Sequence, residues 1–367
     1  DLTVDVSTSV ITKLEEEAID GTWTSVTVPG SNYWEGITYG NGKFVAVASS
    51  GTNRTMVSSD GVTWTSYPAS VADETTAGWR AVTFGNDKFV AVSPAPAPAK
   101  AMYSTDGVNW TSSTTVPSGY WTNITYGNGT FVAMGAPGKA IYSTDAITWT
   151  EVSLPVATQS CGGIAYANGK FIAVSEPGNT ATPQFFTSPD GISWTTISIP
   201  SAVKSYNWGG IVYGEDRWVA VSYIGASDSV LYSLDNGVSW ISTTAPSTAS
   251  WSSITYGDGE FVAVGYGAER SMYSVDGINW SDGNGSLDSS MWNSVAYGNG
   301  KFVAVSGNGL VMYSVTGTGA VGAEQVLTLT DTTGLSSINQ GDTVIQNSGG
   351  TPETSAITNV ATVVGGW

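Results

Sequence analysis

Short apolar stretches alternate with turn residues along most of the chain. Residues 251–280 contain four such stretches, and they are joined at 257–259 and at 276–277 by Gly-Asp-Gly and Asp-Gly corners. Stretches of this length, rich in Val, Ile, Phe, Tyr and Trp, are typical of β-strands. An Asp-Gly or Asn-Gly pair supplies the positive φ angles that a tight hairpin needs. The pattern therefore predicts four antiparallel strands that run back and forth in one small sheet.

This four-strand unit recurs along the chain. First strands are expected to begin at Trp34, Trp79, Trp121, Cys161, Trp208, Trp251 and Trp292. The intervals of 40 to 47 residues between them are typical of four-stranded propeller blades rather than of helical solenoids. The second strand is close to KFVAV in every unit. Because it lacks polar alternation, we expect it to be covered on both faces, as a blade between two neighbours would be.

The ends of the repeat predict how the ring closes. The seventh unit, 292–315, stops before a fourth strand, whereas residues 21–28 resemble a last strand with nothing before it. Pairing the two would leave no open sheet edge. We therefore predict an all-β fold, a seven-bladed β-propeller with four-stranded blades over 20–316. Residues 1–19 are interpreted as an N-terminal attachment segment, and 317–367 as a C-terminal β-rich docking tail. Since the chain begins at Asp1 rather than Met, we expect a processed protein or a fragment.

In six of the seven units the third strand is followed by a turn that ends in tryptophan. Ser233 to Trp240 reads Ser-x-Asp-x-Gly-x-x-Trp, and five other turns are one residue shorter, with Ala146 in the glycine position of one of them. These turns resemble the Asp-box of sialidase-type propellers, and the resemblance implies a structural role rather than an activity. The residues concerned are Asp60, Asp106, Asp145, Asp190, Asp235 and Asp276, with Trp23, Trp64, Trp110, Trp149, Trp194, Trp240 and Trp280. Each carboxylate is expected to accept N–H groups two or three residues on.

The strand order predicts two unlike rims. Corners after first and third strands lie on one rim, which we call the constant rim because its sequence recurs. Loops after second and fourth strands lie on the opposite, variable rim; they are 67–78, 93–100, 175–184, 265–270 and 281–291. Variable loops on a rigid scaffold are a common location for binding, and neutral drift explains the variation equally well.

Aromatic residues supply the candidate binding groups. Tyr33, Tyr120, Tyr206, Tyr223 and Tyr266 lie outside the repeat pattern and toward the variable rim. Trp34, Trp121 and Trp251 begin first strands and would belong to a ring near the central channel. Such a ring is either a stacking platform for sugars or part of the core. Because most tryptophans occupy repeat positions, the core interpretation is favoured.

The amino-acid composition excludes several classes of partner and of catalytic site. With 30 acidic and 12 basic residues the net charge is −18, which gives no electrostatic basis for binding nucleic acid or an anionic membrane. No apolar run is long enough to span a bilayer, so we expect no membrane insertion. The single cysteine excludes an internal disulfide. The lack of histidine excludes catalytic triads based on histidine and metal sites ligated by histidine.

A glycosidase needs two carboxyls across one cleft, yet Glu35 is the single acid on the expected first strands. Other loop acids are scattered over different blades: Asp73, Glu74, Glu151, Glu176, Asp228 and Glu269. The arginines, Arg54, Arg80, Arg217 and Arg270, do not predict the cluster that a sialidase needs. We therefore expect no enzyme and no cofactor. Calcium at 215–216 or in the 282–288 loop stays open as an alternative, although neither stretch offers a full ligand set.

The tail at 317–367 resembles small β segments in virion proteins of marine tailed phages. This resemblance implies a non-enzymatic virion component of tail-fibre, baseplate or capsid-decorating type, located on the virion or outside the cell. Its partners would be other virion proteins or a host-surface polysaccharide, bound by the variable rim. The alternative is a secreted lectin or glycoside hydrolase on a sialidase-like propeller. A third is an assembly factor of the photosystem II type, whose arginine-rich contact face is missing here.

Overall fold

The computed structural model describes residues 22–69, 78–94, 100–136, 138–156, 160–176, 185–203, 206–224, 226–266, 271–283 and 291–315, with two strands at 343–347 and 357–362. Contacts divide the chain into two compact units, 17–318 and 1–16 with 319–367. The expected attachment segment at 1–19 lies outside the described residues. Within the expected docking tail, the structure describes one hairpin, β29 (Thr343–Asn347) with β30 (Ile357–Thr362).

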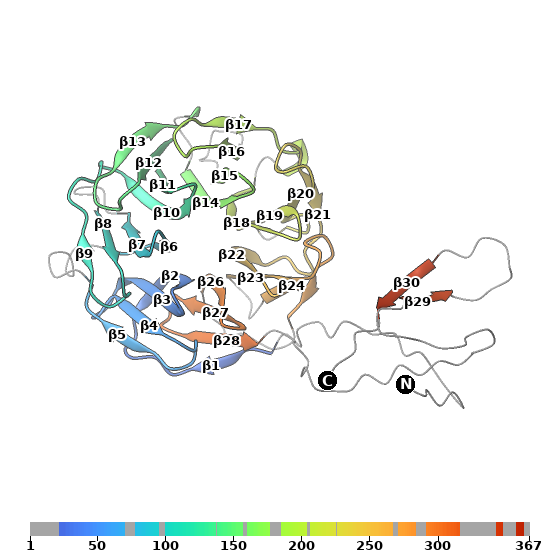
Figure 1. Ribbon diagram of the computed structural model, residues 1–367, viewed down its shortest axis with the longest axis horizontal. Helices are drawn as coiled ribbons and strands as arrows, with labels where there is room; N and C mark the ends of the chain where they lie inside the picture. The colour runs from blue at the N-terminus through green and yellow to red at the C-terminus, as the bar shows by residue number, and fades with distance from the viewer. Residues whose placement is uncertain are drawn as a thin grey trace. The chain divides into compact units, whose positions relative to one another are not determined.

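The unit 17–318 contains seven four-stranded antiparallel sheets arranged around a ring, as Figure 1 shows. The blades, in chain order, begin with the innermost strands β2 (Tyr33–Gly40), β6 (Ala81–Gly85), β10 (Tyr120–Gly127), β14 (Ser160–Ala167), β18 (Trp208–Gly214), β22 (Ser250–Gly257) and β26 (Trp292–Gly298). The second strands are β3 (Lys43–Ser50), β7 (Lys88–Ser93), β11 (Thr130–Ala136), β15 (Lys170–Glu176), β19 (Arg217–Ser222), β23 (Glu260–Tyr266) and β27 (Lys301–Ser306). This is the seven-bladed β-propeller that the repeat predicts.

The outer strands are shorter. The third strands are β4 (Thr55–Ser58), β8 (Lys100–Ser104), β12 (Lys139–Ser143), β16 (Phe185–Ser188), β20 (Val230–Ser233), β24 (Ser271–Ser274) and β28 (Val311–Val315). The outermost strands of blades 1 to 6 are β5 (Thr65–Tyr67), β9 (Thr111–Ser112), β13 (Thr150–Ser153), β17 (Thr195–Ile197), β21 (Ile241–Thr243) and β25 (Ser281–Asp282). A 3₁₀ turn, η1 (Ser201–Val203), precedes blade 5.

Blade 7 takes its outermost strand from the other end of the propeller. Strand β1 (Thr24–Val26) pairs antiparallel with β28, with Thr24 opposite Tyr313 and Val26 opposite Val311. Figure 1 shows the blue and orange strands side by side at this junction. The predicted closure of the ring is therefore confirmed, and the closing strand joins segments about as far apart in sequence as the propeller allows.

The core lies between blades rather than within them. Along β3, Phe44 and Ala46 pack in one cluster with Trp34 and with Val303 of blade 7. Val45 and Val47 of the same strand pack instead in a cluster with residues of blade 2. Side chains of successive residues point to opposite faces of a strand, so an uninterrupted apolar run supplies both interfaces at once. This explains why the second strands lack polar alternation.

The turns after the third strands are held by a serine and an aspartate. Asp60 Oδ1 accepts the backbone N–H groups of Val62 at 2.8 Å and Thr63 at 2.7 Å. The buried Ser58 hydroxyl donates to the same oxygen at 2.9 Å and accepts the N–H of Gly61 at 2.8 Å. The N–H of Thr63 contributes most to lowering the pKa of Asp60 to about 2; burial acts against it, and Val62 and Ser58 assist.

The same carboxylate geometry recurs at the other five turns, in Asp106, Asp145, Asp190, Asp235 and Asp276. The tryptophan that ends the turn donates its indole N–H to the glycine carbonyl in Trp64, Trp110, Trp194, Trp240 and Trp280. Trp149 donates to Ser113 Oγ instead, and Trp23 donates to Ser271 Oγ of blade 6. Of the seven, Trp110 and Trp280 are half-buried and the others buried.

Each of these turns presses against the preceding blade. Gly107, at φ 75°, leaves so little space that a Cβ there would lie 2.8 Å from Cγ2 of Val45 in blade 1. Lys43 of blade 1 also donates to the carbonyl of Asp106 at 3.1 Å. The turns therefore tie neighbouring blades together as well as reversing the chain.

The corners after the first strands complete the constant rim. Both residues of each corner have positive φ, for example Asn41 at 46° and Gly42 at 73°, as a tight two-residue hairpin requires. The aromatic residue before each corner lies over a residue of the preceding blade, and a Cβ added to Gly85 would lie 2.1 Å from Cγ of Tyr126. Close packing thus accounts for the glycine before the corner, and positive φ accounts for the glycine within it.

Candidate functional site

A bulge in the innermost strand turns side chains toward the central channel. In β2, the register with β3 shifts between Trp34 and Gly36, so Glu35 is the extra residue. Equivalent shifts occur in β10, β14, β18, β22 and β26. Bulges commonly re-aim a side chain beside a functional site. Here they allow the two residues after the tryptophan, such as Glu35 and Gly36, to line the same space.

That space is a cavity of about 420 Å³ at the variable-rim end of the channel. Its lining includes the rings of Tyr120, Tyr223 and Tyr266 and a set of aliphatic side chains. These aliphatic residues come one from each of six innermost strands: Ile37, Val82, Ile124, Ile164, Ile211 and Ile254. A volume of this size is typical of pockets for small ligands. The cavity lining therefore combines polar and apolar side chains.

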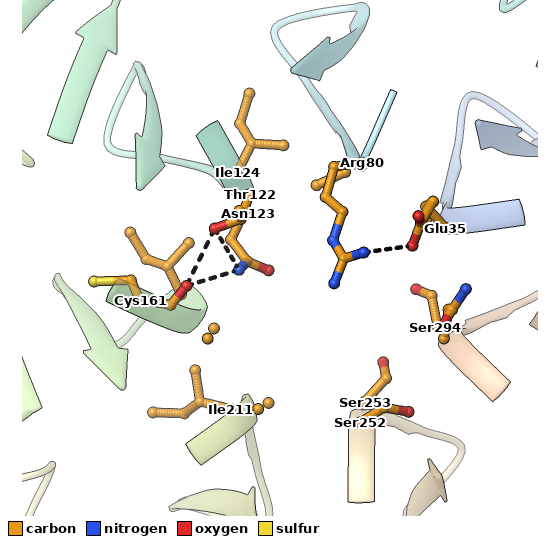
Figure 2. Close-up of a pocket in the computed structure, with 18 of the residues that line it drawn as sticks. Glu35, Arg80, Thr122, Asn123, Ile124, Cys161, Ile211, Ser252, Ser253 and Ser294 are labelled. Atoms are coloured by element: carbon orange, nitrogen blue, oxygen red, sulfur yellow. Dashed lines mark hydrogen bonds and ion pairs between the residues drawn. The ribbon is translucent and has the colours of Figure 1, made fainter. Parts of the chain in front are cut away.

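Glu35 and Arg80 are the charged residues among the described residues that line the cavity. Arg80 Nη1 donates to Glu35 Oε2 at 2.7 Å. Figure 2 shows the guanidinium extending into the middle of the cavity, with Glu35 beside it on the neighbouring strand. Burial acts to lower the pKa of Arg80, but Glu35, Tyr223 and Tyr266 outweigh it and raise that pKa. The guanidinium is therefore held charged at the centre of the site.

Polar side chains join neighbouring innermost strands around the same cavity. Asn123 and Thr122 of blade 3 donate to the carbonyl of Cys161 in blade 4, at 3.1 and 3.2 Å, as Figure 2 shows. Asn293 of blade 7 donates to the carbonyl of Trp34 at 2.7 Å. These bonds fix the walls on both sides of the Glu35–Arg80 pair. The result is a preorganised cavity.

Two of the candidate tyrosines form a pair on one wall. Tyr223 and Tyr266 occupy equivalent positions in blades 5 and 6, with ring centroids 6.0 Å apart and planes inclined by 32°. The Tyr223 ring lies over Gly209, where a Cβ would approach it to 2.6 Å. The Tyr266 hydroxyl donates to Asn293 Oδ1. The glycine therefore makes room for an aromatic side chain against the wall.

The other sequence candidates are placed differently. Tyr120 lines the cavity and is 47% exposed. Tyr33 and Tyr206 are not among the lining residues: the Tyr33 hydroxyl meets Met291 Sδ at 3.9 Å, and the Tyr206 ring packs 6.1 Å from that of Trp208. Three of the five tyrosines are thus brought together, and two are not.

The tryptophan candidates were wrong as binding residues. Trp34, Trp121 and Trp251 have no exposed surface, and each lies in an interblade core cluster. Their rings point into the joints between blades while the residues after them line the channel, so they cannot stack on a ligand. The core interpretation, which the sequence favoured, holds for all three.

Sequence reasoning did not identify Arg80. It treated the arginines as scattered and noticed Glu35 alone on the first strands, although both residues directly follow the first-strand tryptophan of their units. Opposite charges at equivalent positions of consecutive blades were the available signal. Of the other arginines, Arg54 and Arg217 do not line the cavity, and Arg270 lies outside the described residues.

Much of the variable rim's loop sequence, including 70–77, 95–99, 177–184, 267–270 and 284–290, lies outside the described residues. So do Asp73, Glu74 and Glu269 and most of the proposed calcium loop. Glu151 pairs with Lys139 at 2.8 Å, away from the cavity. Glu215 accepts the Tyr256 hydroxyl at 2.6 Å; burial, with help from this carboxylate, raises the pKa of Tyr256 to about 12.

In the part of the chain that the structure describes, no three metal-ligating side chains of His, Cys, Asp or Glu gather together. No described helix is long and apolar enough to cross a membrane. Among the described residues that line the cavity, Glu35 supplies the single carboxyl, whereas glycoside hydrolysis uses two. What the described cavity offers is a set of hydrogen-bonding groups, aromatic rings and one reachable cation.

No model of a known protein family matches the sequence, and no curated protein matches it significantly. Solved structures do resemble it. Virginiamycin B lyase from Staphylococcus aureus, in a catalytically inactive form solved with quinupristin, has a TM-score of 0.69 at 15% identity, over 80% of this chain and 99% of that one. YCF48 bound to a D1 peptide has a TM-score of 0.62 at 18% identity, over 82% and 98%.

YCF48 from Cyanidioschyzon merolae has a TM-score of 0.61 at 16% identity, over 80% of this chain and 98% of that one. At such identities the likeness concerns the fold alone. The similar proteins include an enzyme and a peptide-bound protein, so the fold by itself does not decide between catalysis and binding. The comparisons place this chain among seven-bladed β-propellers.

Proposed function

We propose that the protein is a binding propeller that holds a saccharide in the cavity at its variable rim and carries out no reaction on it. The observation behind this proposal is the cavity itself. One wall carries the Tyr223–Tyr266 pair, and the centre carries the Arg80 guanidinium beside Glu35. Sugars present both C–H faces, which pack on aromatic and aliphatic surface, and hydroxyls, which hydrogen-bond to planar polar groups.

Catalysis receives less support. The lyase that resembles this chain was made inactive by replacing a histidine with alanine, and this chain contains no histidine. The lyase's chemistry therefore has no counterpart among these residues. A glycoside hydrolase would need a second carboxyl opposite Glu35, and none of the described lining residues supplies one.

The setting we propose is the surface of a tailed-phage virion, where the variable rim meets a host-surface polysaccharide or a neighbouring virion subunit. Its support is the resemblance of the tail at 317–367 to phage virion segments and of the Ser-x-Asp turns to the Asp-box. Mass spectrometry of purified virions would detect this chain if it is a virion component. Its absence from virions would leave a secreted lectin as the remaining form of the proposal.

Binding is tested with an array of bacterial and other glycans, followed by calorimetric titration of the best ligand. Tyr223→Ala removes one member of the tyrosine pair, and we expect at least a tenfold loss of affinity, which corresponds to about 1.4 kcal/mol. Tyr67→Ala serves as the matched control because Tyr67 ends the outermost strand β5, away from the cavity. Equal losses in the two variants, or no binding to any glycan, would contradict the proposal.

A further inference from the structure

The two members of the central ion pair are not equally accessible. The Arg80 side chain is 38% exposed, whereas that of Glu35 is 6% exposed. A ligand in the cavity therefore reaches the guanidinium but meets little of the carboxylate. An arginine carries five N–H donors, and the hydrogen bond to Glu35 is the one that the described residues make with this side chain. Donors consequently remain for a ligand.

The charge that these donors carry is already balanced. Glu35 lies 2.7 Å from Arg80, and the rest of the described lining is uncharged. A buried carboxylate beside a cation is held strongly, because either charge alone would be costly to bury. An acidic ligand would bring a second negative group close to Glu35, in a protein whose net charge is already −18. A neutral hydroxyl would accept from Arg80 without that repulsion.

From this arrangement we infer that the cavity selects neutral saccharides over acidic ones, and that Glu35 is the residue that determines this selectivity. The inference rests on the proposed saccharide binding and specifies its ligand class. Glu35 acts by occupying Arg80, so that the arginine serves as a donor to hydroxyls rather than as a receptor for carboxylates. The aliphatic residues of the described lining add no group that would compensate a second anion.

The test compares sugars that differ only at C6, namely glucose against glucuronic acid and galactose against galacturonic acid, each at the end of the same oligosaccharide. Affinities are measured by calorimetry at low and physiological salt. In the unaltered protein we expect the neutral member of a pair to bind at least tenfold more tightly. Equal or tighter binding of the acidic member would overturn the inference.

The decisive variant is Glu35→Gln, which keeps an oxygen acceptor for Arg80 and removes the negative charge. We expect the preference to shift toward the acidic sugar by at least tenfold, and the gain to shrink as salt rises, because exposed charges are screened. The matched control is Glu151→Gln, which removes the same charge from the Lys139 pair outside the cavity. It should leave the preference unchanged.

Three outcomes separate the explanations. An unchanged preference in Glu35→Gln, or an equal shift in Glu151→Gln, refutes the role of Glu35 while saccharide binding stands. A double variant, Glu35→Gln with Arg80→Gln, should lose the gain for acidic sugars; if it keeps the gain, Arg80 is not the group involved. If the unaltered protein binds neither member of any pair nor any other glycan, the proposed function fails, and this inference fails with it.

Discussion

The two rims of the propeller are formed by the same strands, but residues repeat from blade to blade on one rim and vary on the other. On the constant rim, one contact recurs from blade to blade: a glycine turn pressed against a side chain of the preceding blade, as Gly107 is against Val45. On the variable rim, the residue after the first-strand tryptophan changes at almost every blade, from Glu35 and Arg80 to Gly209 and Asn293. Residues that recur from blade to blade hold the blades together. Residues that vary at one position of an otherwise repeated strand line the cavity.

The bulge allows one innermost strand to contribute both to the core and to the cavity lining. It adds one residue to the innermost strand, while the residues on either side of it, Trp34 and Gly36, pair with the consecutive residues Ala48 and Val47 of β3. Side chains at the bulge can therefore vary while the core stays intact. The difference between the rims predicts that constant-rim changes lower stability and that variable-rim changes alter binding.

Lowering the pH should reduce the stability of the fold more than any single substitution, because it protonates the aspartates of all six turns. The backbone N–H groups of Thr63 and Thr148 are the largest influences that lower the pKa values of Asp60 and Asp145, each to about 2 from 3.8. A carboxyl with a lowered folded pKa stabilises the fold above its unfolded pKa, and that contribution is lost as the pH falls through the folded value. We expect the Tm to fall steadily between pH 4 and pH 2. A constant Tm across that window would contradict the role of the turns.

Among single substitutions, Trp240→Ala should cause the largest loss of stability. Trp240 is buried in the cluster between blades 4 and 5, and removing a large buried aromatic costs about 3–5 kcal/mol. Urea unfolding would measure the loss. Trp110→Ala is the matched comparison, since Trp110 is half-buried at the equivalent position. Equal losses would mean that burial against the neighbouring blade is not what these tryptophans contribute.

An added methyl group tests the close packing of the constant rim. In Gly40→Ala, the new Cβ would lie 2.1 Å from Cγ of Phe84, and overpacking of this kind costs about 1–3 kcal/mol. Blade 4 carries Ala167 at the same position. Ala167→Gly should therefore change the free energy of unfolding by less than about 1 kcal/mol. A Gly40→Ala protein as stable as the parent would remove close packing as the reason for these glycines.

A single turn is tested by Asp190→Ala. The carboxylate accepts N–H groups from Ile192 at 2.9 Å and Ser193 at 2.8 Å. Because the turn is partly solvated, we expect a loss of about 1–2 kcal/mol. Asp190→Asn keeps one oxygen acceptor and should lose roughly half as much. An asparagine variant that is less stable than the alanine variant would be inconsistent with hydrogen bonding as the cause.

The smallest effect on stability is expected at the variable rim. Tyr120 is 47% exposed, so Tyr120→Ala should change the free energy of unfolding by no more than about 0.5 kcal/mol. The same variant should bind the saccharide more weakly, because Tyr120 lines the cavity. A variant that loses stability but keeps full affinity would reverse the assignment of the rims.

The sequence predicted the fold well because the fold is repeated. Seven copies of one pattern, from strand starts to corner pairs, allow a weak local signal to be read many times. The closing strand was found for the same reason, since Trp23 has the place of a turn tryptophan with no turn before it. The partner that Trp23 finds, Ser271 of blade 6, could not be foreseen, because it depends on how blades 6 and 7 meet.

The site was predicted less completely. Tyr120, Tyr223 and Tyr266 were identified because they break the pattern, but so do Tyr33 and Tyr206, which the fold directs elsewhere. Glu35 and Arg80 are 45 residues apart in sequence, and only the ring brings them to 2.7 Å. The bulge at Glu35 in β2 has no evident signature of its own in the sequence. Local patterns therefore identified the strands, whereas the cavity required the closed ring.

Hydrogen–deuterium exchange of the unaltered protein, with and without a saturating neutral saccharide chosen from the array, tests the central claim most directly. The account predicts slower exchange where the innermost strands line the cavity, at 35–37, 80–82 and 122–124, and around Tyr223 and Tyr266. The Ser-x-Asp turns at 58–64 and 104–110 should be unchanged. Protection concentrated in those turns, with the bulges unaffected, would place binding on the opposite rim and contradict the division that the structure indicates.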